Sequence, residues 1–317
     1  MLGRMLCTLF LQRSFTAAMA TPATMAKELD KFFQNINKMP TANNTWEDVL
    51  LENAHRVSTP LVMQMLNQMG INKDTATPFR MFENACGAGV VAPVLQRLIK
   101  PEVLKQSSIL CGDFSEPAIG LVKRRIESEG WTNTEAQRID GQKTGLADGQ
   151  FTHVTTNIGY HVIPDSEAAL DETIRVLKPG GILGFTTWHQ EPGWSVEARE
   201  AFAAFPFEAP YGLALQVTSW GNWHDVNWIE RTLEAKGIQD IKVNVFAHLT
   251  QADNAEHFMS SCSMMVDWIM NSNWSEEMRK EHPREEVIEL IKGFLEKKYE
   301  GKPWKMSWVS IIATGRV

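Results

Sequence analysis

The chain has 317 residues, of which 44% are hydrophobic, and a formal net charge of −7 at pH 7. This length can bury a complete α/β core and leaves residues for a cap. The acidic balance disfavours broad binding to nucleic acid or to anionic membranes, because both need a basic surface. The four cysteines are scattered without metal-like spacing, so we expect free thiols, no metal site and a reducing compartment.

The first 27 residues differ in composition from the rest of the chain. They contain three basic residues and no acidic one, and their apolar positions fall at helical spacing. This composition is typical of a mitochondrial transit peptide, whereas the apolar run is too short for stable membrane insertion. The alternative is a start at Met19 or Met25. We therefore treat residues 1–27 as a flexible or targeting segment and expect a cytoplasmic protein, with a mitochondrial location as the alternative.

Residues 28–78 are predicted to form an N-terminal helical lid. The pattern from Glu28 to about Gly70 is helical, and either Asn44 or Thr45 fits the N-cap position before Trp46. A loop then leads into the first strand.

The segment 79–89 predicts a buried strand, a glycine turn and the start of a helix. Glu83 ends the apolar run, and Gly87 and Gly89 allow the backbone to approach a ligand closely. The turn also satisfies the dinucleotide fingerprint, and a glycine turn can simply connect a strand to a helix.

Further strands are expected at about 107–113, 134–139, 151–157 and 182–188, with helices around Ile119 and over 165–176. This alternation predicts a parallel, doubly wound sheet. Asp113 ends the second strand, where βαβ nucleotide sites bind ribose hydroxyls. Asp140 follows the third strand, and its carboxylate is suited to accept from an exocyclic amine.

Beyond Trp188 the regular alternation is lost. Helices are expected at 228–236 and within 256–299, and strands at 241–246 and 308–314. We expect residues 191–317 to supply substrate-cap helices and the closing strands of the sheet.

Four blocks of sequence, residues 83–89, 111–116, 123–131 and 175–181, resemble class I S-adenosylmethionine-dependent methyltransferases. Among these they are similar to fungal secondary-metabolite enzymes such as gliotoxin bis-thiomethyltransferase. The block Arg-Val-Leu-Lys-Pro-Gly-Gly before a strand is a hallmark of that family and is not expected of dehydrogenases. The resemblance makes residues 79–190 an S-adenosylmethionine-binding, Rossmann-like core. Ala85 departs from the pattern, since many members have a glycine there.

The resemblance implies a mostly parallel sheet of seven strands, S-adenosylmethionine as the cofactor, and a small-molecule methyl acceptor that reacts through oxygen, sulfur or nitrogen. The cofactor-binding residues that it implies are Glu83, Ala85, Gly87, Gly89, Asp113, Phe114, Ser115, Asp140, Gly141, Gln142 and Asn157. The two glycines would pack under the methionyl group, Asp113 would hold the ribose and Phe114 would flank the adenine. A helix cap is the alternative role for Asp113, a turn acid for Asp140 and a structural role for Asn157.

Methyl transfer from a sulfonium is an in-line displacement that chiefly requires alignment and exclusion of water. A base helps where the nucleophile is protonated, and His161 and His189 follow the fourth and fifth strands, where open α/β sheets bind ligands. They are the candidate catalytic residues, with a surface or hydrogen-bonding role as the alternative. Trp46, Trp188 and Trp194 are candidate substrate-binding residues, with core packing as the alternative.

Two other functions fit parts of the sequence. An NAD(P)-dependent oxidoreductase shares the glycine turn and the acid after the second strand, but it does not explain residues 178–181. A methyltransferase fold without catalytic activity, acting as a regulator, is the second alternative.

Overall fold

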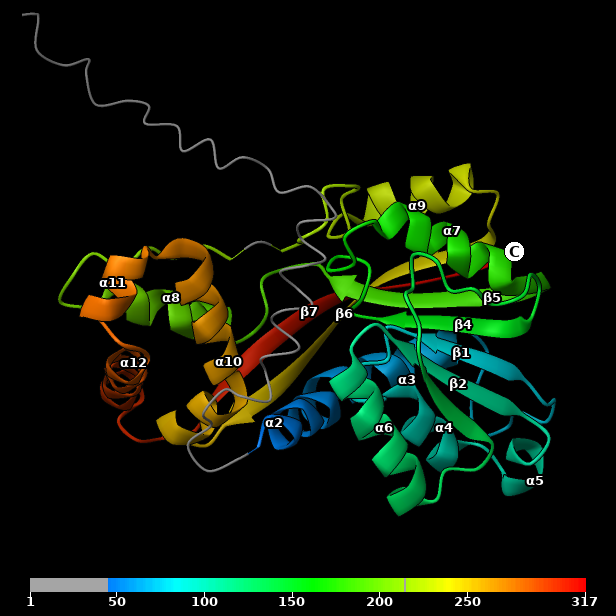
Figure 1. The fold of residues 1–317 in the computed structure, drawn as a ribbon, viewed down its shortest axis with the longest axis horizontal. Helices are drawn as coiled ribbons and strands as arrows, with labels where there is room; N and C mark the ends of the chain where they lie inside the picture. Colours follow the sequence, from blue (N-terminus) through cyan, green and yellow to red (C-terminus); the bar gives the residue numbers. More distant parts are fainter. Residues whose placement is uncertain (1–44, 214) are drawn as a thin grey trace, which may run out of the picture.

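The computed structural model describes residues 45–213 and 215–317. The segment 1–27 and the first part of the predicted helical lid, residues 28–44, lie outside the described residues. Figure 1 shows a central twisted sheet with helices on both faces and a separate group of helices at one end.

Seven strands of the described chain form one sheet in the order β3-β2-β1-β4-β5-β7-β6. They are β1 (Arg80–Asn84), β2 (Ser108–Asp113), β3 (Thr134–Arg138), β4 (Phe151–Asn157), β5 (Leu177–Trp188), β6 (Gln239–Ala252) and β7 (Trp304–Arg316). β1 to β5 pair in parallel, and β7 is antiparallel to both β5 and β6. The predicted doubly wound, mostly parallel sheet is therefore confirmed. Its strand order reverses between β1 and β4, which is where such sheets bind ligands.

The helices lie on both faces of the sheet and in a group at its end. They are α2 (Trp46–Asn53), η2 (Ala54–Ser58), α3 (Thr59–Gln68), α4 (Val91–Leu98), α5 (Pro101–Leu104), α6 (Glu116–Glu129), α7 (Ser166–Val176), α8 (Ser195–Ala203), α9 (Val226–Ala235), α10 (Ala255–Asn273), α11 (Glu276–Glu281) and α12 (Arg284–Tyr299). α3, α4 and α6 cover one face through buried residues such as Met65, Val91 and Ile119. α7 and α9 cover the other through Leu170 and Ile229.

The strands β6 and β7 extend beyond the rest of the sheet. Within β7, only Ser310–Arg316 pair with β5, so the first half of β7 pairs with β6 alone. Trp304, Met306 and Trp308 of this two-stranded ribbon pack against α8, α10 and α12 in a second apolar cluster. The helices α10 to α12 fall within the range where the sequence predicts helices, whereas α8 was not predicted.

The N-terminal helical run begins at a well-defined cap. The Thr45 hydroxyl accepts from the Asp48 backbone N–H at 3.2 Å, and the Asp48 carboxylate accepts from the Thr45 N–H at 2.8 Å. This reciprocal capping box selects Thr45 from the two predicted cap residues. From there α2, the short π-helix η2 and α3 follow one another without a break.

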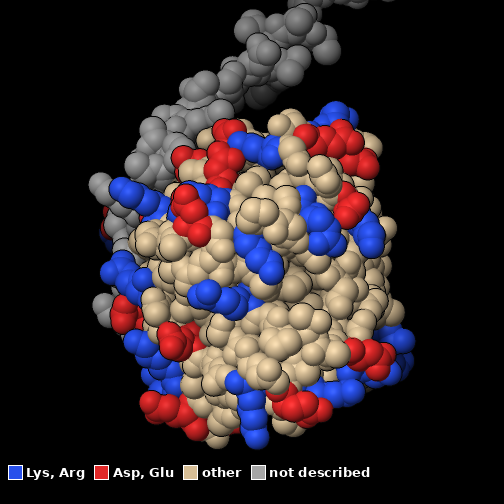
Figure 2. All heavy atoms as spheres, turned by 90° about the vertical axis from the view of Figure 1, so that its right-hand side faces the viewer, with Lys and Arg blue, Asp and Glu red and all other residues tan. Residues whose placement is uncertain are grey.

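The surface at the C-terminal end of the chain carries both signs of charge. In Figure 2, which faces the side at the right of Figure 1, Lys and Arg side chains are interspersed with Asp and Glu. Among the described residues, no helix has the length and apolar character needed to cross a membrane.

We predict that Met65→Ala lowers the free energy of unfolding by about 2–4 kcal/mol, because it leaves a cavity between α3 and the sheet. Met65 is fully buried, whereas Met63 on the same helix is 52% exposed. Met63→Ala is thus a matched control and should change the stability by less than about 0.5 kcal/mol. Urea denaturation measures both values. Equal losses for the two variants would contradict the packing of α3 on the sheet.

Candidate functional site

A cavity of about 340 Å³ lies at the carboxyl ends of β1, β2 and β4, beside the N-terminal helical run. Its walls come from five parts of the chain. The lining residues are Trp46, Leu50, Asn53, Ala54, Ser58, Asn84, Ala85, Cys86, Gly87, Ala88, Val90, Asp113, Phe114, Ser115, Ala118, Ile139, Asp140, Gly141, Gln142, Asn157, Ile158, Gly159, Val162, Ile163 and Pro164. The cavity thus occupies the point where the strand order reverses.

The turn after β1 has the left-handed backbone that its glycines predict. Ala85 and Gly87 both have φ of 53°. A Cβ placed on Gly87 would meet no atom within 4 Å, so this residue leaves open space next to the cavity. Gly89 is different: a Cβ there would lie 3.2 Å from Val122 and 3.5 Å from Trp131, so it faces the core. Gly89 permits close packing against α6 and does not line the cavity.

Glu83 is a buried carboxylate that holds the start of α4. It is 1% exposed, and its Oε1 accepts from the N–H groups of Val90 and Val91, both at 2.9 Å. Its Oε2 accepts from the N–H of Ala92 at 3.2 Å. Burial raises the pKa of Glu83, and the backbone hydrogen bonds oppose that rise. Glu83 does not line the cavity, so it supports the turn and makes no wall of the site.

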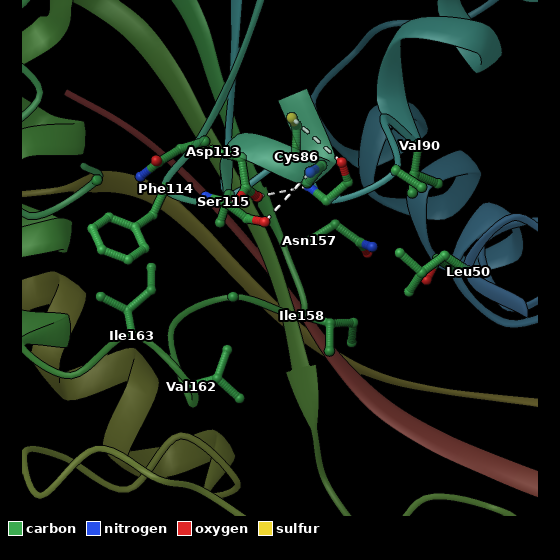
Figure 3. Close-up of a pocket in the computed structure, with 18 of the residues that line it drawn as sticks. Leu50, Cys86, Val90, Asp113, Phe114, Ser115, Asn157, Ile158, Val162 and Ile163 are labelled. Atoms are coloured by element: carbon green, nitrogen blue, oxygen red, sulfur yellow. Dashed lines mark hydrogen bonds between the residues drawn. The ribbon is translucent and has the colours of Figure 1, made fainter. Parts of the chain in front are cut away.

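Asp113 lies at the end of β2 and faces the cavity (Figure 3). Its Oδ2 accepts from the Gly87 N–H at 2.8 Å, and its Oδ1 accepts from the Ser115 N–H at 2.9 Å. Burial raises the pKa of Asp113, and hydrogen bonds from Ser115 and Gly87 act in the opposite direction. Each carboxylate oxygen can accept a further hydrogen bond. Ser115 itself caps α6, since its Oγ accepts from the Ala118 N–H at 3.4 Å.

One end of the cavity is bounded by Phe114, whose ring faces Ile163 in Figure 3. Phe114 is 37% exposed. The guanidinium of Arg138 lies 5.2 Å from the centre of its ring. Phe114 and Ile163 thus present two apolar surfaces at this end of the cavity, which suit a flat ring.

The segment after β3 forms a hydrogen-bonded turn beside this end. Asp140 Oδ1 accepts from both the N–H and the side-chain amide of Gln142, each at 2.9 Å. Gln142 Oε1 accepts from the Asp165 N–H at 2.8 Å. At Gly141 a Cβ would lie 2.6 Å from Asn84 Oδ1, so any larger residue would displace Asn84. Asp140 therefore serves as a turn acid, and its second oxygen remains available.

The opposite end of the cavity is formed by Asn157 and by the N-terminal helical run. Asn157 Oδ1 accepts from the Thr186 hydroxyl at 2.7 Å. Trp46 and Leu50 of α2 line the same cavity. Asn53 of α2 donates to the carbonyl oxygen of Ser261 on α10 at 2.9 Å, which ties this wall to the C-terminal helices.

Both candidate catalytic histidines lie outside the cavity lining, contrary to expectation. His161 is 5% exposed, and its ring centre lies 6.4 Å from that of Trp188. The physical reason is that the loop after β4 lines the cavity with Val162, which leaves the neighbouring His161 side chain enclosed in the protein. The His189 Nδ1 is 2.9 Å from the carbonyl oxygen of His224, so His189 is held against the loop that precedes α9.

Two of the three candidate substrate-binding tryptophans are also outside the cavity lining. Trp188 packs against Trp308 of the β6–β7 ribbon, with ring centres 5.6 Å apart. Trp194 is 7% exposed and belongs to the apolar cluster around α8 and α10. Trp188 ends β5 and Trp194 follows it, and β5 runs toward the ribbon, away from the predicted cofactor-binding residues. Of the three, Trp46 lines the cavity.

Several lining residues could not be selected from the sequence. Asn84 ends β1 and Cys86 lies in the turn that follows, and neither residue type by itself indicates a cavity wall. Leu50 was one apolar residue of a helix, with no sign of what it would contact. A usable signal was the apolar run 162–164 in the loop after the carboxyl end of the fourth strand.

We predict that Glu83→Gln lowers the free energy of unfolding by about 2–4 kcal/mol. An amide offers one accepting oxygen, so its NH₂ group would face a buried backbone N–H that then has no acceptor. Glu127→Gln on the exposed surface of α6 is the control and should be neutral. Thermal and denaturant unfolding measure the difference. A neutral Glu83→Gln would mean that this carboxylate does not hold the turn.

We predict that His161 makes the protein less stable in mild acid. Burial lowers its pKa to about 4 from the ordinary 6.5, so between these values the unfolded chain binds a proton that the folded chain does not. This contribution to stability is fully present above pH 6.5 and is lost as the pH falls toward 4. From pH 6.5 to 4.5 the loss is about 2 kcal/mol.

The test compares His161→Phe with His55→Phe, which alters an exposed histidine. His161→Phe should flatten the decline of unfolding free energy from pH 6.5 to 4.5, and His55→Phe should leave it unchanged. Part of the decline should remain, because burial also lowers the pKa of His153 to about 4. An unaltered slope in His161→Phe would show that His161 is protonated in the folded protein.

Comparisons with known proteins agree with the geometry. Residues 82–181 match the family described as "Methyltransferase domain". Methyltransferase tpcH of Aspergillus fumigatus is 28% identical over 265 residues, which cover 82% of this chain and 93% of that protein. The acetylaranotin bis-thiomethyltransferase of Aspergillus terreus is 26% identical over 248 residues, covering 78% and 85%.

Among solved structures, the fold is similar to that of phosphoethanolamine N-methyltransferase 2 from Haemonchus contortus in complex with S-adenosyl-L-methionine. The TM-score is 0.50 at 15% identity, over 90% of this chain and 59% of that chain. The matched domain, the fungal relatives and the seven-stranded sheet identify the chain as a class I S-adenosylmethionine-dependent methyltransferase similar to fungal secondary-metabolite methyltransferases.

Proposed function

We propose that the cavity binds S-adenosylmethionine together with a small, largely apolar methyl acceptor, and that the acceptor is a secondary metabolite. The observation that carries this proposal is the partly buried carboxylate of Asp113 at the end of β2. Each of its oxygens accepts a hydrogen bond from one backbone N–H. The carboxylate faces the cavity and can accept further hydrogen bonds there. A pair of ribose hydroxyls has the donors that such a carboxylate needs.

The residues around Asp113 fit the other parts of the cofactor. Phe114 and Ile163 offer two apolar surfaces for the adenine ring, and the free oxygen of Asp140 is an acceptor for its amine. On the other side of Asp113, the space above Gly87 suits the methionyl chain, because no Cβ fills it. The residues at each position therefore match the group that they would contact.

The acceptor would bind between the N-terminal helical run and the loop after β4. Trp46, Leu50, Ile158 and Val162 supply apolar walls there, and burial of an apolar acceptor against them would exclude water. The A. terreus relative is named as a bis-thiomethyltransferase, which makes a thiol one acceptor group to test alongside hydroxyls and amines.

The bound cofactor would supply a methyl group on a positively charged sulfur. The task of the protein is then to align the acceptor with that methyl group and to keep water out. His161 and His189 do not line the cavity. We therefore propose that catalysis depends on positioning and on the acceptor's own acidity, without a histidine as general base.

We predict that Asp113→Ala weakens binding of S-adenosylhomocysteine by about 30- to 1,000-fold, which corresponds to about 2–4 kcal/mol. The variant loses the acceptor for the ribose and also frees the Gly87 N–H. Asp74→Ala is the control, since Asp74 is 75% exposed and pairs with its neighbour Lys73. Calorimetric titration measures both affinities. Unchanged affinity in a folded Asp113→Ala protein would contradict the proposal.

A further inference from the structure

The side chain of Asn157 is held in one orientation by a threonine on the neighbouring strand. The Thr186 hydroxyl, fully buried on β5, accepts from the Ile158 N–H at 3.0 Å. Its single proton then goes to Asn157 Oδ1, 2.7 Å away. Because the oxygen of the amide is paired in this way, the NH₂ group of Asn157 must take the other position.

Thr186 also holds the residue that follows Asn157. Ile158 has φ of 52°, a left-handed conformation that is costly for a β-branched side chain. Its N–H lies 3.0 Å from the carbonyl oxygen of Thr186 and 3.0 Å from the Thr186 hydroxyl. One threonine thus fixes two consecutive residues of the cavity wall, at the cost of local strain.

The NH₂ group of Asn157 has no hydrogen-bond acceptor among the described residues. Asn157 lines the cavity, and Figure 3 shows its amide directed toward Leu50. Leu50, Ile158 and Val162, which line the same cavity, are aliphatic. A donor in such surroundings is left unpaired when an apolar ligand displaces water, and this selects for a ligand that brings an acceptor.

We propose that Asn157 donates a hydrogen bond to an oxygen of the methyl acceptor, and that Thr186 is the positioning residue that aims this donor. The inference rests on the proposed function and names a property of the substrate class: an apolar molecule with a carbonyl, hydroxyl or phenolate oxygen at its reacting end. An acceptor without such an oxygen binds less well, because it leaves the amide of Asn157 unpaired.

The position of Asn157 favours the acceptor over the cofactor as its partner. Phe114 and Ile163 lie at one end of the cavity in Figure 3, and Asn157 and Leu50 lie at the other, with Asp113 between them. Leu50 belongs to α2, so Asn157 faces the helical wall that closes the acceptor end.

The experiment compares two probes of similar shape, acetophenone and ethylbenzene, of which only the first has an oxygen. Each is titrated by NMR into the protein saturated with S-adenosylhomocysteine, so that no turnover is needed. We expect the wild-type protein to bind acetophenone about three- to tenfold more tightly than ethylbenzene, as one neutral hydrogen bond predicts.

Variants of Asn157 and Thr186 distinguish a hydrogen-bond donor at Asn157 from a residue with only a structural role. Asn157→Ala should remove the preference for acetophenone, Thr186→Val should reduce it at least twofold, and Thr186→Ser should keep it. Thr187→Val is the matched control: Thr187 is equally buried on β5, but its hydroxyl binds the carbonyl oxygen of Trp223. In the Asn157→Ala background, Thr186→Val should not alter the preference further, since Thr186 acts through Asn157.

Each result decides the proposal. A preference for acetophenone that survives Asn157→Ala, or the absence of any preference in the wild-type protein, overturns it. A loss of S-adenosylhomocysteine affinity in Asn157→Ala, with the preference intact, would assign Asn157 to the cofactor and also overturns it. Asn157→Ala alone is sufficient should Thr186→Val fail to fold. Failure of the proposed function is distinct, because the wild-type protein would then not bind S-adenosylhomocysteine.

Discussion

The hydrogen bond from the Gly87 N–H to Asp113 joins the end of β1 to the end of β2, and the shape of the site depends on it. Glu83 acts on the other side of the same turn, where it accepts from the first N–H groups of α4. Two carboxylates, the buried Glu83 and the partly buried Asp113, therefore hold the turn between them. Both pay a desolvation cost that the backbone donors offset, and one of them remains open to a ligand.

The residues that the sequence identified best are those whose position follows from the parallel sheet itself. Asp113 and Asn157 each end a strand and Asp140 follows one, and the carboxyl ends of parallel strands meet at one edge. That these three residues lie close together can be predicted from the strand assignments alone, and the apolar runs supply those assignments. The sequence predicts that Gly87 and Gly89 both lie in the turn. It does not indicate that Gly87 faces the cavity and Gly89 the core.

The direction of the loops could not be read in the same way. Whether His161 or its neighbour Val162 faces the cavity depends on a single residue of register in a loop, which no periodic pattern fixes. The strands β6 and β7 are also longer than the sequence predicts. Half of β7 pairs only with β6 and packs against α8, α10 and α12, and no local pattern indicates these contacts. The wall made by α2 depends on contacts with α10, such as Glu52 with His257 at 2.9 Å.

The most direct test of the account is a crystal structure of the protein with S-adenosylhomocysteine. The account predicts both ribose hydroxyls within hydrogen-bond distance of the Asp113 carboxylate, with the adenine between Phe114 and Ile163 and the sulfur toward Asn157. A ligand bound elsewhere, or bound in the cavity without contact to Asp113, would contradict it.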